Sequence, residues 1–347
     1  MTKYRFDQIA LNSTEKKKPV EEDRFTYLGL EHLDSGSLKV SRYGSEVAPI
    51  GEKLVMRKGD VLFGKRRAYQ KKVAIAPFDG IFSAHGMVLR PKEDVVDKDF
   101  FPLFISSDYF LDAAIKISVG SLSPTINWRD LKELEFELPD LESQKRLAST
   151  LWTMNETMDS YKELIAATDE LVKSQFIEMV GGIPLSSKWE MQPLGKIGEN
   201  LDSRRVPITS GSREPGPYPY YGASGVVDYV KDYIFDEDIL LISEDGANLL
   251  ARVTPIAFSV SGKVWINNHA HVMRFSTLAK QKVVEQYLNS ISLSDYITGT
   301  AQPKLNQEKL NSILIPCVPG ELEEQFAAFV QQSDKSKLLL KKIISRR

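Results

Sequence analysis

Residues 120–131 read GSLSPTINWRDL, and residues 299–310 read GTAQPKLNQEKL. Each stretch holds a glycine, three residues, a proline, one residue, an aliphatic residue, an asparagine and a short run that ends in leucine. The glycine permits a tight turn, the proline stiffens the loop, and the asparagine is a preferred N-cap. The chain therefore contains one loop-to-helix joint twice, which predicts two copies of one fold.

Three further matches keep the same order along the chain. Tyr4–Ile9 matches Trp189–Leu194, Gly59–Lys65 matches Glu237–Ser243, and His85–Arg90 matches His269–Arg274. The offsets are 185 (4 to 189), 178 (59 to 237), 184 (85 to 269) and, for the joints, 179 (120 to 299). Chance similarity would not keep this order and spacing, so we expect two similar domains of short buried strands with some helix.

A heptad pattern follows the first half of the chain. One seam consists of Leu151, Met158, Ile165, Val172 and Met179, and the other of Leu147, Met154, Tyr161, Thr168 and Gln175. This spacing, sustained over more than four heptads, predicts a long helix that begins after an Asp140 N-cap and ends at Gly181-Gly182.

The end of the chain carries a second such pattern. Leu322, Phe329 and Ile343 lie on one seam and Phe326 and Leu340 on the other, with Ser333 and Ser336 as polar interruptions. We expect the two helices to pair as an antiparallel intramolecular coiled coil with pseudo-twofold symmetry. Amphipathic helices that pack separately on their own domains remain the alternative.

The expected fold class is therefore α+β, with two similar mixed α/β domains separated by a pair of long helices. The predicted boundaries are 1–139 for the first domain, 140–182 for the central helix, 183–318 for the second domain and 319–347 for the C-terminal helix.

Composition limits the classes of function. The chain of 347 residues has 45 Lys and Arg, 47 Asp and Glu, and a formal net charge of −2. It shows neither a long apolar run nor a signal-peptide profile, so we expect a cytoplasmic protein without a membrane partner. The single cysteine, Cys317, excludes an internal disulfide and a multi-thiolate metal site.

The sequence shows none of the common catalytic motifs that we sought, which are a phosphate-binding glycine loop, a His-Glu-x-x-His zinc motif and a Gly-x-Ser-x-Gly elbow. His269-Ala-His271 resembles a metal pair, but alternate residues of a strand face opposite sides. We expect no catalytic residue, metal site or cofactor on this chain.

Signals for nucleic-acid binding are stronger. From Lys39 to Lys72 there are ten Lys or Arg and three Asp or Glu. Such cations neutralise phosphates, and arginine also reads guanine; a solvated basic loop is the alternative. The first-half candidates for DNA contact are Lys65, Arg66, Arg67, Tyr69, Lys71, Lys72, Ser121, Ser123 and Thr125.

The second half carries a less basic set. Four segments fit exposed polar loops: Arg204-Arg205, Gly211–Gly225, Glu244–Asn248 and Asn267-Asn268. Asparagine pairs with adenine, and acidic residues accept from cytosine. The second-half candidates for DNA contact are Arg204, Arg205, Tyr220, Tyr221, Ser224, Asn248, Asn267, Asn268, Thr300, Gln302 and Lys304.

Nearly the whole chain resembles the specificity subunits of Type I restriction-modification systems. The residues that carry the resemblance are YPYYGASGVVDYVKDYIFDEDILLISEDGAN (218–248), TGTAQPKLN (298–306), LPDLESQKRLA (138–148) and PGELEEQFAAF (319–329). The first half fits the family pattern less well, because FGKRRAYQKKVAIAPF stands where the second half has LISEDGANLLARVTPIAF.

The resemblance implies two target-recognition domains, each contacting one half of a bipartite double-stranded DNA sequence. It implies that the helices set the spacing and dock two methyltransferase subunits, and that restriction (motor-nuclease) subunits join for cleavage. S-adenosylmethionine, ATP and Mg are then expected on those partner subunits. A coiled-coil scaffold without DNA readout and a stand-alone DNA-modifying enzyme are the alternative functions.

Overall fold

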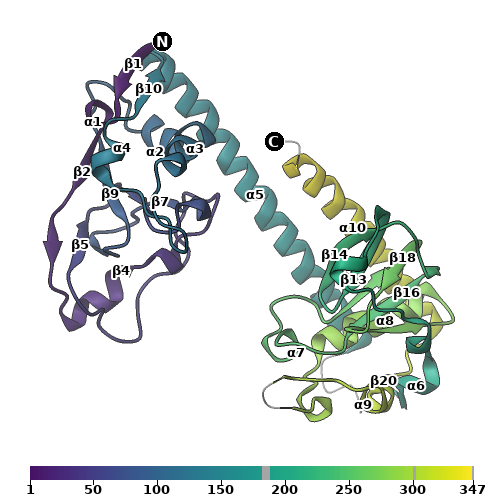
Figure 1. Ribbon diagram of the computed structural model, residues 1–347. Helices are drawn as coiled ribbons and strands as arrows, with labels where there is room; N and C mark the ends of the chain where they lie inside the picture. The colour runs from purple at the N-terminus through teal and green to yellow at the C-terminus, as the bar shows by residue number, and fades with distance from the viewer. Residues whose placement is uncertain (182–187, 300–301, 346–347) are drawn as a thin grey trace. The chain divides into compact units, whose positions relative to one another are not determined.

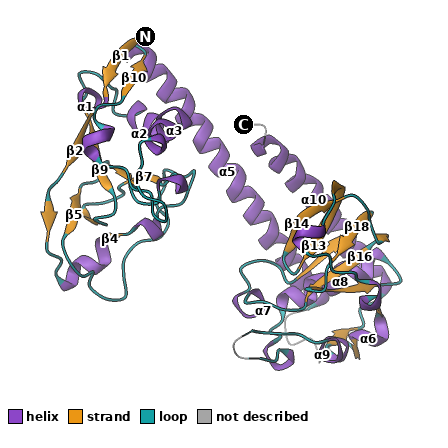
Figure 2. Ribbon diagram, viewed as in Figure 1, coloured by secondary structure: helices purple, strands orange, loops and turns teal. Residues whose placement is uncertain are grey.

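The structure is a computed structural model that describes residues 1–181, 188–299 and 302–345 (Figure 1). The chain divides into two compact units, residues 1–158 and 159–347. Each unit mixes helices and short strands, as the sequence predicts (Figure 2). None of the helices among the described residues is long and apolar enough to span a membrane.

The first unit begins and ends its globular part with paired strands. Its strands are β1 Thr2–Arg5, β2 Ala10–Ser13, β3 Lys16–Lys17, β4 Tyr27–Leu28, β5 Lys53–Met56, β6 Val61–Phe63, β7 Val73–Ile75, β8 Gly80–Phe82, β9 Met87–Pro91 and β10 Glu135–Leu138. Its helices are α1 Phe6–Ile9, α2 Phe100–Ser106, α3 Asp108–Lys116 and α4 Trp128–Leu131, with 3-10 turns η1 Glu21–Thr26, η2 Leu30–His32 and η3 Ala68–Gln70. Helix α5, Leu141–Val180, starts in this unit.

The second unit repeats this order. Its strands are β11 Met191–Pro193, β12 Glu199–Asn200, β13 Pro215–Gly222, β14 Gly225–Val230, β15 Phe235–Asp236, β16 Ile239–Ser243, β17 Ala257–Val260, β18 Lys263–Ile266, β19 Ala270–Arg274 and β20 Leu314–Pro316. Its helices are α6 Leu194–Ile197, α7 Asn248–Ala251, α8 Leu278–Ser290, α9 Gln307–Ser312 and α10 Gly320–Ser345, with 3-10 turns η4 Asp202–Arg204, η5 Ser210–Ser212 and η6 Ser294–Tyr296.

Strand pairing shows that the two units share one topology. The antiparallel sheet β2-β9-β6-β7 of the first unit corresponds to β12-β19-β16-β17 of the second, and the ribbon β1-β10 corresponds to β11-β20. In the other sheet, β5-β8-β4 corresponds to β15-β18-β13, and in each unit the last two of these strands are parallel. The copies differ at the edges of this sheet, where the first adds β3 beside β5 and the second adds β14 beside β13.

The register corrects two of the four predicted offsets. Val61 pairs with Leu89, and Leu240 pairs with Met273, so β6 matches β16 with an offset of 179 (61 to 240) rather than 178. These two inner strands are buried on both faces, since all three residues of β6 and all five of β16 are buried. A strand without hydrophobic alternation does not reveal its register, which explains the error of one residue.

The opening segments also need a new offset. Phe6 and Leu194 each begin a one-turn helix and each donate a backbone hydrogen bond of 2.8 Å, to Leu134 O and Ile313 O respectively. The offset is therefore 188 (6 to 194), not 185, because the pattern of one aromatic and one aliphatic residue was too permissive. The offsets of 184 for the histidine segments and 179 for the joints agree with the strand register.

The segment Gly211–Gly225 differs from the exposed loop that we expected. Most of it forms strand β13, which pairs with β14 and β18 at the centre of its sheet. Tyrosine favours strands, and the glycines and prolines that suggested a loop lie in an irregular pairing with register shifts.

The first part of α5 packs against its own domain. Asp140 caps the helix by accepting from Ser143 N at 2.9 Å, as predicted. The buried Gln144 accepts from Asp97 N at 2.8 Å and donates to Val95 O at 3.1 Å. These contacts select the buried face, so Ala148 is buried and the predicted seam residues Leu147 and Met154 are exposed.

Within the second unit α5 and α10 pair antiparallel, as predicted. The rings of Phe176 and Phe326 lie 5.3 Å apart, and Lys337 Nζ lies 2.9 Å from Asp169 Oδ1, so residue numbers fall on one helix as they rise on the other. Phe326 and Ser333 are on the buried seam, as expected. The predicted seam residues Leu322 and Phe329 are half-buried and pack against the core, and the neighbouring Glu323 and Val330 are buried more deeply.

Candidate nucleic-acid interface

In the first unit the joint bonds directly to the basic loop. We call residues 119–127 the first joint and residues 64–72 the β6 loop. Pro124 O accepts from Arg67 N at 2.8 Å, and Ile126 N donates to Lys65 O at 2.9 Å. Arg66 and Thr125 form an isolated antiparallel bridge. Two features that the sequence presents about 55 residues apart therefore form one surface.

The second unit makes the same contacts at the same offset. We call residues 298–306 the second joint, of which 300 and 301 lie outside the described residues, and residues 244–252 the β16 loop. Gly246 N donates to Pro303 O at 3.1 Å, and Leu305 N donates to Glu244 O at 2.8 Å. Asp245 and Lys304 form the antiparallel bridge. The repeated sequence is thus a brace: in each copy it holds the loop that follows β6 or β16 in place.

The glycine of each joint is required by its backbone. Gly120 has φ of 112° and Gly299 has φ of 83°, and both values favour glycine. A Cβ on Gly299 would also lie 2.5 Å from Gln302 O. Asn306 caps α9 by accepting from Lys309 N at 2.9 Å, whereas Asn127 occupies the N-cap position of α4 without a side-chain cap bond.

The six β6-loop candidates differ in accessibility. Arg66, Arg67 and Tyr69 are exposed. Lys71 is held by ion pairs to Asp108 and Asp112, and Lys72 donates to Leu30 O at 2.6 Å.

Lys65 is half-buried, and this burial, together with the nearby Lys16 cation, lowers its pKa. In the first joint Ser121 is exposed, whereas Ser123 and Thr125 are half-buried, with Thr125 Oγ1 donating to Ser123 O at 3.0 Å.

Several second-half candidates belong to the framework. Tyr220 is 1% exposed and its hydroxyl binds the backbone of Ile208. Asn267 is buried, and its side-chain oxygen accepts from His269 N. This hydrogen bond shapes the turn before β19. Arg205 is largely buried between carboxylates, and Asn248 exchanges hydrogen bonds with the backbone of Thr254. In this structure Tyr220, Asn267 and Arg205 stabilise the domain and offer little surface to a ligand, while the half-buried Asn248 closes its own loop.

The other second-half candidates are more accessible. Ser224, Asn268, Gln302 and Lys304 are exposed. Arg204 stacks over Phe235 and pairs with Glu237, while the half-buried Tyr221 packs against Phe258. Thr300 lies outside the described residues.

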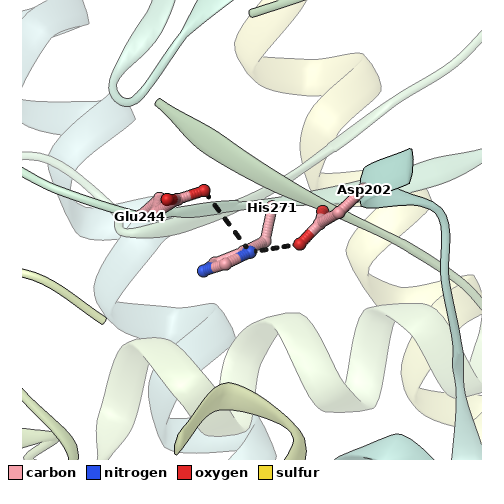
Figure 3. Close-up of side chains that lie close together, drawn as sticks. All are labelled: Asp202, Glu244 and His271. Carbon is pink, nitrogen blue, oxygen red and sulfur yellow. Dashed lines mark hydrogen bonds and ion pairs between the residues drawn. The ribbon is translucent and has the colours of Figure 1, made fainter. Parts of the chain in front are cut away.

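Sequence reasoning did not identify a buried charge network in the second unit (Figure 3). His271 Nδ1 lies 2.6 Å from Asp202 Oδ2, and His271 Nε2 lies 2.7 Å from Leu305 O. Both partners are acceptors, so a ring with a proton on each nitrogen satisfies both contacts. Glu244 Oε2 is 3.7 Å from His271 Nδ1 and 2.7 Å from Arg205 Nη1.

The network favours ionised carboxylates. Burial alone would raise the pKa of Asp202, but hydrogen bonds from His271 and Val272 N and the nearby Arg205 lower it. Burial would also raise the pKa of Glu244. The nearby Arg205, His271 and Lys304 outweigh this effect and lower the pKa.

Asp202, Glu244 and His271 have the composition of a metal site. Arg205 supplies positive charge there, however, and His271 Nδ1, the ring nitrogen that faces the carboxylates, is bonded to Asp202 Oδ2. The cluster is best described as an ionic tie that joins η4, β19, the β16 loop and the second joint.

In each unit another histidine contacts the β6 loop or the β16 loop. Arg66 Nη1 is 3.3 Å from His85 Nε2 in the first unit, and His269 Nδ1 is 2.9 Å from Asp245 Oδ2 in the second. The match between His85 and His269 in the aligned halves is the sequence signal that could have located these pairs.

Comparison with known proteins agrees with the duplicated fold. The family model described as the Type I restriction modification DNA specificity domain matches residues 13–167 and again residues 186–346. A putative type I restriction enzyme specificity subunit of Haemophilus influenzae is 34% identical over 139 residues, 40% of this chain and 36% of that one. The EcoDI specificity subunit of Escherichia coli is 28% identical over 203 residues, 56% of this chain and 45% of that one. These matches span less than half the length of either relative.

Two solved structures share the fold. The S subunit of a type I restriction-modification system from M. genitalium has a TM-score of 0.59 at 17% identity, covering 99% of this chain and 92% of that one. A chain from a structure of the type I R-M system, described in terms of complex assembly and conformational transition, has a TM-score of 0.51 at 18% identity, covering 99% and 93%. At these identities the likeness concerns the fold alone. Because the family model covers both copies and most of the sequence, the chain belongs to the family of Type I restriction modification DNA specificity domains.

Proposed function

We propose that this chain is the DNA-sequence-reading subunit of a Type I restriction-modification complex. Each domain contacts one half of a bipartite double-stranded target through its braced loop. The observation that carries the proposal is the repeated brace: Pro124 and Pro303 hold corresponding loops on one shared framework. The loops differ in their polar side chains, as two readers of different half-sites require.

The family supports this assignment and guides the choice of partners. We propose that two modification subunits carry S-adenosylmethionine and methylate the DNA, and that restriction subunits use ATP and Mg for cleavage. This chain contributes recognition and spacing, with domains at 1–139 and 183–318 and helices at 140–182 and 319–347. Its target is chromosomal and incoming DNA, so we place it in the cytoplasm. Neither a scaffold without DNA readout nor a stand-alone enzyme is favoured by a specific observation.

The paired helices carry apolar residues that could dock a partner. In the second unit Leu164, Leu171 and Ile177 of α5 and Leu338 and Leu339 of α10 are exposed. Where such side chains form a contiguous patch, they mark an interaction surface. They support the proposal that a modification subunit binds these helices.

An exchange of domains tests the proposed function. Residues 1–139 are replaced by the corresponding domain of a related specificity subunit, and the hybrid is expressed with its modification partner in a host without that methylation. Sequencing of methylated adenines is expected to show a new sequence in one half-site and the original sequence in the other. A change in both half-sites, or in neither, would contradict the assignment of one domain to one half-site.

A further inference from the structure

Arg66 and Asp245 occupy one structural position in the two copies. Each forms the antiparallel bridge to the joint, Arg66 with Thr125 and Asp245 with Lys304, and both partners differ by 179 (66 to 245 and 125 to 304). Each also contacts the histidine that precedes the strand paired with its own, His85 before β9 and His269 before β19. The position is therefore built in the same way twice, but its charge is opposite.

In the first copy the position presents hydrogen-bond donors. A guanidinium only donates, so the 3.3 Å contact makes His85 Nε2 the acceptor and leaves the ring proton on Nδ1. Burial, then Arg66 and Lys65, lower the pKa of His85, which is consistent with a neutral ring. No carboxylate among the described residues forms an ion pair with Arg66. His85 therefore orients the exposed guanidinium group, a planar fork of N–H donors, without neutralising its charge.

In the second copy the position presents acceptors. Both carboxylate oxygens of Asp245 lie within 3.0 Å of His269 Nδ1, which donates to them. In the neutral ring His269 Nε2 is then a further acceptor, and this side chain is 50% exposed while that of Asp245 is 17% exposed. The neighbouring Lys304 forms an ion pair with Glu244, with Lys304 Nζ 3.2 Å from Glu244 Oε1.

We propose that this position is a base-reading position used with opposite hydrogen-bond polarity in the two domains. Arg66 reads a guanine, whose O6 and N7 accept from the guanidinium fork in the major groove. Asp245 with His269 reads an exocyclic amino group, which cytosine N4 and adenine N6 provide. The inference rests on the proposed function and adds the class of base that each domain selects.

The test uses the whole chain with its modification partner and maps methylated adenines in a host genome. Arg66→Gln removes the fork, and Arg66→Lys keeps the charge but cannot form the planar bidentate contact. Both variants are expected to relax one guanine position of one half-site by roughly 5- to 150-fold while the other half-site is unchanged. Asp245→Asn is expected to relax one cytosine or adenine position of the other half-site. Arg57→Gln, an exposed arginine of the first unit paired with Glu15, is the matched control.

Two results would overturn the inference and leave the proposed function intact. In one, Arg66→Lys retains full selectivity, or Arg66→Gln lowers methylation equally at all sites, as expected for a phosphate contact. In the other, Asp245→Asn leaves the motif unchanged. A wild-type chain that yields no bipartite motif would instead contradict the proposed function. Thermal unfolding of each variant is compared with wild type to confirm that the substitutions leave the fold intact.

Discussion

Replacing Asp202 by asparagine should destabilise the second domain far more than a change of one atom suggests. Asp202 Oδ1 accepts from Val272 N at 2.8 Å, and Oδ2 lies 2.6 Å from His271 Nδ1. An asparagine has one acceptor oxygen, so it cannot accept from both Val272 N and a proton on His271 Nδ1, and its amide carries no negative charge to pair with His271 or Arg205. The His271 side chain is 1% exposed, and water cannot restore the lost contact.

The expected magnitude follows from this burial. Removing one partner of a buried ion pair costs about 3–5 kcal/mol. For a domain of this size about 1 kcal/mol shifts Tm by about 2–4 °C, so Asp202→Asn should lower Tm of the second domain by roughly 6–20 °C. Asp228→Asn is the control, because Asp228 pairs with Arg213 at a more exposed site, where water and salt screen the pair.

Hydrogen-exchange mass spectrometry in increasing urea measures the effect, because it reports the amides of each unit separately. The first unit should be unaffected. His271→Met offers a second test, since the buried Met87 stands at the equivalent position of the first copy. Adding His271→Met to Asp202→Asn should recover part of the stability, because the unpaired donor is removed. If Asp202→Asn costs no more than Asp228→Asn, the ionic tie does not stabilise the domain as argued.

Further predictions concern acid, the helix pair and salt. In the folded protein the pKa values of Asp202 and Glu244 lie below their ordinary 3.8 and 4.5. Their contribution to stability is therefore fully present above about pH 4.5 and is lost as the pH falls through the pKa values of the folded state. Acid unfolding followed by circular dichroism should show the second unit losing stability in this pH range. Phe176→Ala, at a buried ring of the helix pair, should cost about 3–5 kcal/mol in urea unfolding, and a cost below about 1 kcal/mol would show that α10 is held without it. Arg67→Gln should reduce the slope of log affinity for duplex DNA against log salt by about one, whereas Lys71→Gln should change it less because two aspartates hold that ammonium; equal effects would contradict the division of the β6 loop.

The sequence predicted the long helices and the duplication, because heptads and repeated turns are local patterns that survive without knowledge of packing. It did not fix which residues face inward. Leu147 was assigned to a seam, but the hydrogen bonds of Gln144 to the first domain turn Ala148 inward instead. The strand register was wrong by one residue in β16 because both faces of that strand are buried.

The candidate site was predictable only in part. The joint and the β6 loop were each found from composition and repetition, yet only the fold shows that Pro124 and Arg67 are in contact. Tyr220 and Asn267 were chosen as polar residues of expected loops, and neither pattern could show that the fold buries them. Burial depends on contacts distant in sequence, so polar residues of a reading surface and of a buried network look alike in the chain.

The most direct test of the proposed function is the methylation map of a host genome that expresses this chain with its modification partner. Two domains with one topology and different loops are expected to produce a single bipartite motif, with two unlike half-sites separated by a fixed number of unspecified base pairs. Loss of the chain should abolish the methylation. A continuous motif, a motif with variable spacing, or methylation that persists without this chain would contradict the account.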